Sequence, residues 1–450
     1  MSFSSGKISG AAPARSSVWK NVRAFFPILG NSANAGRAGI ARIMMIAMVG
    51  AWLLAVRAMC ITDVWDETMA LPLYLEGKPF PLSEVFARKI PVFSTRPIPL
   101  LLQNAVAHCT GDYRTALVLL RGLNAGLLFA SVVLLLATLR RAADFKPWQE
   151  LVFSVAMLFS ASGLITAGWA ANAFDAVCLF FLSAGIYFLL RRSFVVAAGF
   201  LFGLSLFAKE TGVLVFPFVA LLAWQRKITV RQFLELLAAA APLVAAFGCW
   251  RWTVAPPGSA KDVHGFVQSE FWPSLSGWLE SFWRQNLMRA HQTAAGWLWL
   301  AGSLVFLRDR KAQTGAVVLL LASGILYWGM TGGFQDHRVM SSLNFIPRLW
   351  LIPAALFLVL VALQKKSALI AALLIPILIG GFGTFRNHVK FQQAYANAQR
   401  LASARGSSGQ FRVSDSAVSR ELYDSHRDIL YGKFKHYDAV IQPERGNNDN

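Results

Sequence analysis

The chain has 450 residues, of which 56% are hydrophobic and only 15% are charged. A soluble domain carries about 25% charged residues, so this composition argues against a soluble enzyme and indicates an integral membrane protein. Despite the formal net charge of +20 we predict no nucleic-acid partner, because short turns between apolar segments and the N-terminal arm account for most of that charge.

Residues 1–37 are rich in Ser, Ala, Gly and Arg and lack the apolar core of a signal peptide, so we expect a flexible cytoplasmic arm. Residues 38–385 form the predicted transmembrane domain. A spanning helix needs roughly 20 apolar residues, and we count about eleven candidate stretches, which predict an all-α polytopic fold. The stretches are 40–60, 115–139, 148–169, 173–190, 194–208, 211–225, 233–254, 293–307, 313–331, 345–363 and 367–385.

Basic clusters occur at every second connection, and the positive-inside rule makes these connections cytoplasmic. We also expect the clusters to attract anionic membrane lipid. The remaining connections and the tail 386–450 are then expected on the outer side. The clusters are Arg140-Arg141, Arg191-Arg192, Arg226-Lys227 with Arg231, Arg308 to Lys311, and Lys365-Lys366, and the outer connections are 61–114, 169–172, 209–210, 255–292 and 332–344.

The first external loop, residues 61–114, carries three carboxylates directly after the first apolar segment, at Asp63, Asp66 and Glu67. A carboxylate cluster at a helix exit lies where a lipid-borne and a water-borne substrate can meet, so it is the first candidate catalytic centre. The loop is longer and more charged than a passive turn requires. Its prolines and mixed apolar and basic residues predict short interfacial helices that bring Asp66 and Arg96 to a shared cavity.

Several short motifs follow one another in a recognisable order. Asp66-Glu67-Thr68 precedes Leu73-Tyr74-Leu75-Glu76-Gly77-Lys78, then Arg96-Pro97, Gly111-Asp112-Tyr113, Arg121 and finally Phe207-Ala208-Lys209-Glu210-Thr211-Gly212. This order resembles the GT-C membrane glycosyltransferases, in particular the bacterial branch related to protein O-mannosyltransferases and to lipid A aminoarabinose transferases. The resemblance in sequence motifs covers residues 40–225. The remainder of the chain resembles the family only in topology. Arg96 stands where the family pattern often has Lys, which keeps the charge and changes its geometry.

The resemblance implies an enzyme of a bacterial inner membrane that moves a sugar from a polyprenyl-phosphate carrier to an envelope acceptor, whether lipid, glycan or protein, at the outer face. Such a transfer needs a carboxylate near the acceptor hydroxyl and cations near the departing phosphate. We therefore expect Asp66 to be the general base, with Glu67 and Asp63 shaping its field or holding a divalent cation. Arg96 and Lys209 are expected to bind the donor phosphate. The spacing leaves the metal requirement open.

Other interpretations stay open beside this one. Lys209-Glu210 also fits a solvated turn or a neutralised structural pair. Arg338, in the loop 332–344, is a further candidate phosphate ligand because an arginine fork fits phosphate oxygens, but a charged loop that anchors its helix ends explains it equally well. The alternative functions are a polysaccharide polymerase or ligase, and a transporter or flippase of a lipid-linked substrate. A transporter would place ionisable residues deep inside spans and show repeat symmetry.

Overall fold

The computed structural model describes residues 35–59, 96–110, 113–192, 194–254 and 351–364, with short pieces between 310 and 322 and between 370 and 389. These residues lie in helices and turns, and no strand occurs among them, in agreement with the predicted all-α fold. The chain divides into two compact units, Met1–Val49 and Gly50–Asn450.

Four helices in the described part are long and apolar enough to cross a membrane, and a bent pair raises the number to five. The two halves of the pair, α8 (Pro147–Leu158) and α9 (Ala161–Gly168), meet at 62°. The apolar helices indicate a multi-pass membrane protein. The four long helices are α2 (Ala35–Met59), α7 (Tyr113–Ala143), α10 (Ala173–Tyr187, with the turn Phe188–Arg192) and α13 (Val230–Val254).

Shorter apolar helices correspond to four further predicted stretches. The 14-residue α11 rises by about 21 Å, which is less than the roughly 30 Å of a hydrocarbon core. The stretch 293–307 lies outside the described residues and 313–331 is described only in part, so the total of eleven spans stays a prediction. The shorter helices are α11 (Val195–Ala208), Glu210–Trp224, which contains α12 (Val215–Trp224), α18 (Leu351–Leu363) and Ile377–Arg386.

Contacts between helices fix their relative directions. Helices α7 and α10 run parallel: Asn124 on α7 donates to the carbonyl of Trp169 just before α10, at 2.8 Å, and Arg191 after α10 donates to Ala137 farther along α7, at 2.6 Å. Helix α11 runs antiparallel to α10, because the Phe202 ring packs on Gly185 while the thiol of Cys178 approaches the carbonyl of Lys209.

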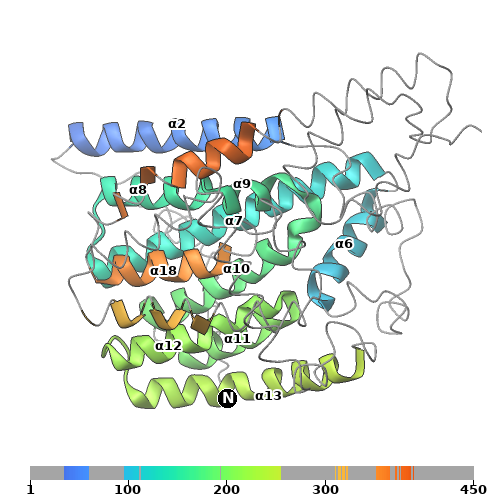
Figure 1. Ribbon diagram of the computed structural model, residues 1–450, viewed down its shortest axis with the longest axis vertical. Coiled ribbons are helices and arrows are strands. Elements are labelled where there is room, and N and C mark those ends of the chain that lie inside the picture. The colour runs from blue at the N-terminus through green and yellow to red at the C-terminus, as the bar shows by residue number, and fades with distance from the viewer. Residues whose placement is uncertain are drawn as a thin grey trace, which may run out of the picture. The chain divides into compact units, whose positions relative to one another are not determined.

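Helices α11 and α13 lie side by side (Figure 1). They run parallel, and two glycines of α11 allow a close approach of the two backbones. A Cβ at Gly199 would lie 2.5 Å from the carbonyl oxygen of Leu236, and one at Gly203 would lie 2.6 Å from the Cβ of Leu243. One turn farther, the rings of Phe207 and Phe247 pack edge to face, with their centroids 5.5 Å apart. The four-residue spacing of the two glycines is typical of membrane helices whose backbones approach closely.

These directions give the bundle two ends of different character. One end, called the paired-charge end, holds Arg96, Asp175, Lys209, Glu210 and Arg251 in ion pairs. The opposite end, called the basic end, holds the α7–α8 and α12–α13 turns and the α10–α11 connection. Two of these turns contain a residue in the left-handed region that stops a helix, Asp144 at φ 52° and Arg226 at φ 57°. Which end faces the cytoplasm stays a prediction.

The glycine contact yields a stability prediction. Gly199→Ala should lower the free energy of unfolding by about 1–3 kcal/mol, because its methyl group collides with backbone atoms of α13. Gly248→Ala is the matched control, since open space surrounds Gly248 on α13 and alanine favours a helix by about 1 kcal/mol. Equilibrium unfolding in mixed micelles measures both. Equal effects of the two substitutions would contradict the packing of α11 on α13.

Candidate functional site

The paired-charge end is built on a break between two apolar helices. Helix α11 ends at Ala208, Lys209 is extended with φ −162°, and a 3-10 turn, Glu210–Leu214, leads into α12. Gly212 closes this turn against α11, where a Cβ would lie 2.5 Å from Ser205 Oγ and 3.0 Å from the Ser205 carbonyl carbon. Only glycine fits this approach, which explains the glycine of the Lys209-Glu210-Thr211-Gly212 motif.

Lys209 and Asp175 form a buried ion pair between the break and the first turn of α10. Lys209 Nζ donates to Asp175 Oδ1, and the two side chains are 2% and 1% exposed. A buried charge is tolerated only when it is paired, because desolvating a single ion costs several kcal/mol. The pair therefore locks the beginning of α10 to the end of α11.

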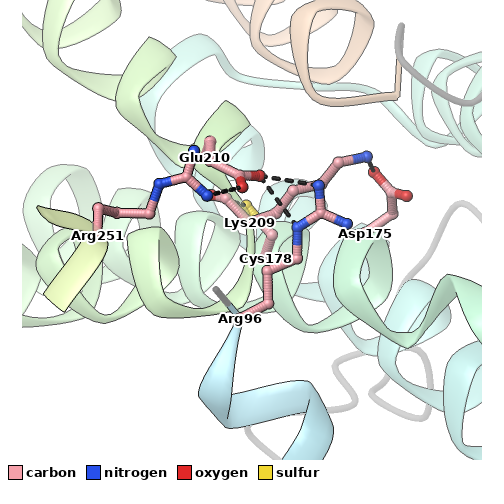
Figure 2. Close-up of polar contacts among 6 residues, drawn as sticks. All are labelled: Arg96, Asp175, Cys178, Lys209, Glu210 and Arg251. Atoms are coloured by element: carbon pink, nitrogen blue, oxygen red, sulfur yellow. Dashed lines mark hydrogen bonds and ion pairs between the residues drawn. The ribbon is translucent and has the colours of Figure 1, made fainter. Parts of the chain in front are cut away.

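Glu210 accepts hydrogen bonds from two arginines of two other segments (Figure 2). Its Oε2 accepts a hydrogen bond from Nε of Arg96 at 3.1 Å and lies 3.0 Å from Nη2 of the same guanidinium. Its Oε1 accepts a hydrogen bond from Nη1 of Arg251 at 2.9 Å. Arg96 directly precedes α6 (Pro97–Thr110), and Arg251 lies near the C-terminus of α13. One carboxylate thus joins three segments that are far apart in the sequence.

The first turn of α10 contacts both cations of this end that the sequence singled out. Asp175 holds Lys209, and the ring of the preceding residue, Phe174, lies 5.0 Å from the guanidinium carbon of Arg96 in a cation–π contact. The position of this turn is set by Asn124 and by Asn172, whose side-chain amide donates to the Ile165 carbonyl at 3.2 Å.

The five side chains of these ion pairs do not carry equal numbers of positive and negative charges. Three cations, Arg96, Lys209 and Arg251, face two carboxylates, Asp175 and Glu210, which leaves a surplus of one positive charge among these five side chains. The arginine side chains keep 12% and 15% exposure, whereas Lys209 is buried. The arginines are therefore the groups that an incoming anion can reach. A partly desolvated guanidinium binds phosphate or carboxylate oxygens strongly.

The structure brings the two described candidates, Arg96 and Lys209, into the same cluster. Lys209 and Glu210 each form an ion pair with a residue of another segment, Lys209 with Asp175 and Glu210 with the two arginines. Asp63, Asp66, Glu67 and Arg338 lie outside the described residues, so their roles stay predictions. Among the described residues no group of three His, Cys, Asp or Glu side chains is placed to hold a metal ion.

Sequence reasoning missed Arg251 and the partner role of Asp175. The contacts that place Arg251 follow one parallel register, in which Gly203 meets Leu243, Phe207 meets Phe247 and Glu210 meets Arg251. The four-residue spacing of Gly199 and Gly203 permits this register but does not identify Arg251. Asp175 offers only a weak signal, because an acidic residue in a first helical turn is also explained by the helix dipole alone.

The buried pair yields a second prediction. Lys209→Met should destabilise the protein by about 3–5 kcal/mol, because it leaves Asp175 buried without its cation. The double variant Lys209→Met/Asp175→Leu should recover most of that loss, since an apolar pair replaces the ionic one. Arg231→Met, which removes an 87% exposed partner of Glu235, is the control and should leave thermal unfolding unchanged. A double variant as unstable as Lys209→Met alone would contradict the assigned pair.

Comparison with known proteins gave no match. No protein-family model matches the chain, and no match was found among curated proteins or solved structures. The family resemblance therefore rests on the ordered sequence motifs alone.

Proposed function

We propose that the protein is a GT-C-like membrane glycosyltransferase, which moves a sugar from a polyprenyl-phosphate carrier to an envelope acceptor. The observation that carries this proposal is the meeting of Arg96, Lys209 and Arg251 at one end of the bundle, where they pair with the carboxylates of Asp175 and Glu210. Two of these cations belong to the motifs that carry the family resemblance.

The proposed chemistry divides the work among these side chains. Bond breaking at the anomeric carbon leaves negative charge on the carrier phosphate, and preorganised cations lower the energy of that step. Arg96 and Arg251 are exposed enough to donate to the phosphate, whereas Lys209 contributes its field from the interior. Glu210 holds both guanidiniums and has both oxygens engaged, so its role is to position them. Asp66 remains the proposed general base.

The arrangement favours transfer over transport. A transporter is expected to place ionisable groups in the middle of its spans. Here Asp175 lies in the first turn of α10, Lys209 and Glu210 follow the last residue of α11, and Arg251 lies one turn from the end of α13. These groups gather where apolar helices begin or end, which suits a lipid-borne donor that meets an acceptor near the membrane surface. A polysaccharide polymerase or ligase would use the same kind of lipid-linked donor. The length of the acceptor is therefore the property that distinguishes it from a transferase of single sugars.

The proposal predicts a loss of sugar transfer in defined variants. In membranes that contain a panel of radiolabelled polyprenyl-phosphate sugars, Arg96→Ala and Arg251→Ala should each lower transfer by roughly 10²-fold, because each removes a donor to the developing charge. Asp66→Asn should abolish transfer, because an amide cannot accept the acceptor proton.

Arg140→Ala is the matched control for an arginine in a partly buried ion pair. Arg140 binds Glu150 at the basic end, away from the proposed site, so its loss should leave the transfer rate within about threefold once protein amount is equalised. An equal loss in Arg96→Ala and Arg140→Ala would count against a phosphate site at the paired-charge end. No transfer from any donor, with folded wild-type protein, would move the proposal to transport.

A further inference from the structure

The basic end carries a concentration of charge that the proposed function does not use. Among the side chains described there, seven are cationic and three are carboxylates, so positive charge exceeds negative by four. The cations are Arg140, Arg141, Lys146, Arg191, Arg226, Lys227 and Arg231, and the carboxylates are Asp144, Glu150 and Glu235.

Internal contacts account for only part of this charge. Arg140 pairs with Glu150, Arg231 pairs with Glu235, and Arg191 donates to the Ala137 carbonyl. Arg141, Lys146 and Arg226 are exposed. Lys146 and Arg141 flank the α7–α8 turn, and Arg226 lies in the α12–α13 turn. The parallel course of α11 and α13 brings the two helix starts to this same end.

Large aromatic side chains lie beside these cations and are themselves exposed. Trp148 is 47% exposed next to Lys146, and Trp224 is 49% exposed next to the Arg226 turn. Phe194, between α10 and α11, is 59% exposed. Tryptophan prefers the level of lipid headgroups, where its ring is apolar and its N–H reaches water. Exposed cations at this level face lipid phosphates more directly than they face solutes in water.

We propose that the basic end is a binding surface for anionic phospholipid headgroups, with Arg141, Lys146 and Arg226 as its principal contacts. Trp148 and Trp224 set the depth at which the surface meets the bilayer. The partner is the phosphate diester of an anionic headgroup such as phosphatidylglycerol, because basic turns beside transmembrane helices attract such lipids. The inference is independent of sugar transfer, since it concerns the opposite end of the bundle.

Spin-labelled lipids measure this preference directly. The full-length protein is reconstituted in phosphatidylcholine, and the relative association of spin-labelled phosphatidylglycerol and spin-labelled phosphatidylcholine is measured by electron paramagnetic resonance. We expect phosphatidylglycerol to be preferred, and the preference to decline as salt screens the charges. The variant Arg141→Gln/Lys146→Gln/Arg226→Gln should lose about fivefold in this preference for each charge removed, until both lipids bind alike.

The matched control is Arg231→Gln/Glu235→Gln, which removes a neutral exposed pair at the same end and should keep the wild-type preference. Substitution of Arg141 and Arg226 by Lys should also keep it, since the charge is unchanged. Equal binding of the two lipids by the wild type would overturn the proposal without recourse to any variant. A triple-glutamine variant that retains the full preference would overturn the assignment to these three residues.

Discussion

A charge inside an apolar bundle must be paired, and this constraint determines how α6, α10, α11 and α13 meet. An unpaired ion in such an interior costs several kcal/mol, so each buried charge requires a partner from a neighbouring helix. The break after α11 presents two consecutive charges, Lys209 and Glu210. Asp175 satisfies the first, and Arg96 with Arg251 satisfies the second. Three separate segments, α6, α10 and α13, are therefore tied to a single turn of backbone after α11.

Much of the local structure follows from the sequence, whereas the partners in the cluster do not. The prolines of the first external loop predicted short helices, and α6 begins at one of these prolines, Pro97, because proline suits a first helical position. The break at 209–210 was also expected from its charges. The partner Arg251 depends on the parallel register of α11 and α13, which Gly199 and Gly203 permit but which no local pattern states. The proposed catalytic carboxylates, Asp63, Asp66 and Glu67, and the full span count lie outside what the described residues test.

The cations at the two ends of the bundle differ in burial and pairing. At the paired-charge end the cations are held by Asp175, Glu210 and the Phe174 ring, in an orientation fixed before any ligand arrives. Such preorganisation suits chemistry at a developing anion, because little rearrangement is needed during the reaction. At the basic end the cations of the turns are exposed beside Trp148 and Trp224, an arrangement that suits a mobile lipid surface. The directions of the helices place these two groups of cations at opposite ends of the bundle.

The cluster depends on Glu210, which joins Arg96 and Arg251 in one network. A double-mutant cycle tests it most directly, with unfolding free energies measured for Arg96→Met, Arg251→Met and the double variant. Either single substitution leaves Glu210 with one arginine, but the double substitution leaves it with neither. If Glu210 joins both arginines, the double variant loses more stability than the two single variants combined, by about 1–3 kcal/mol. Additive losses would contradict it, because they would mean that the two arginines do not share a buried carboxylate.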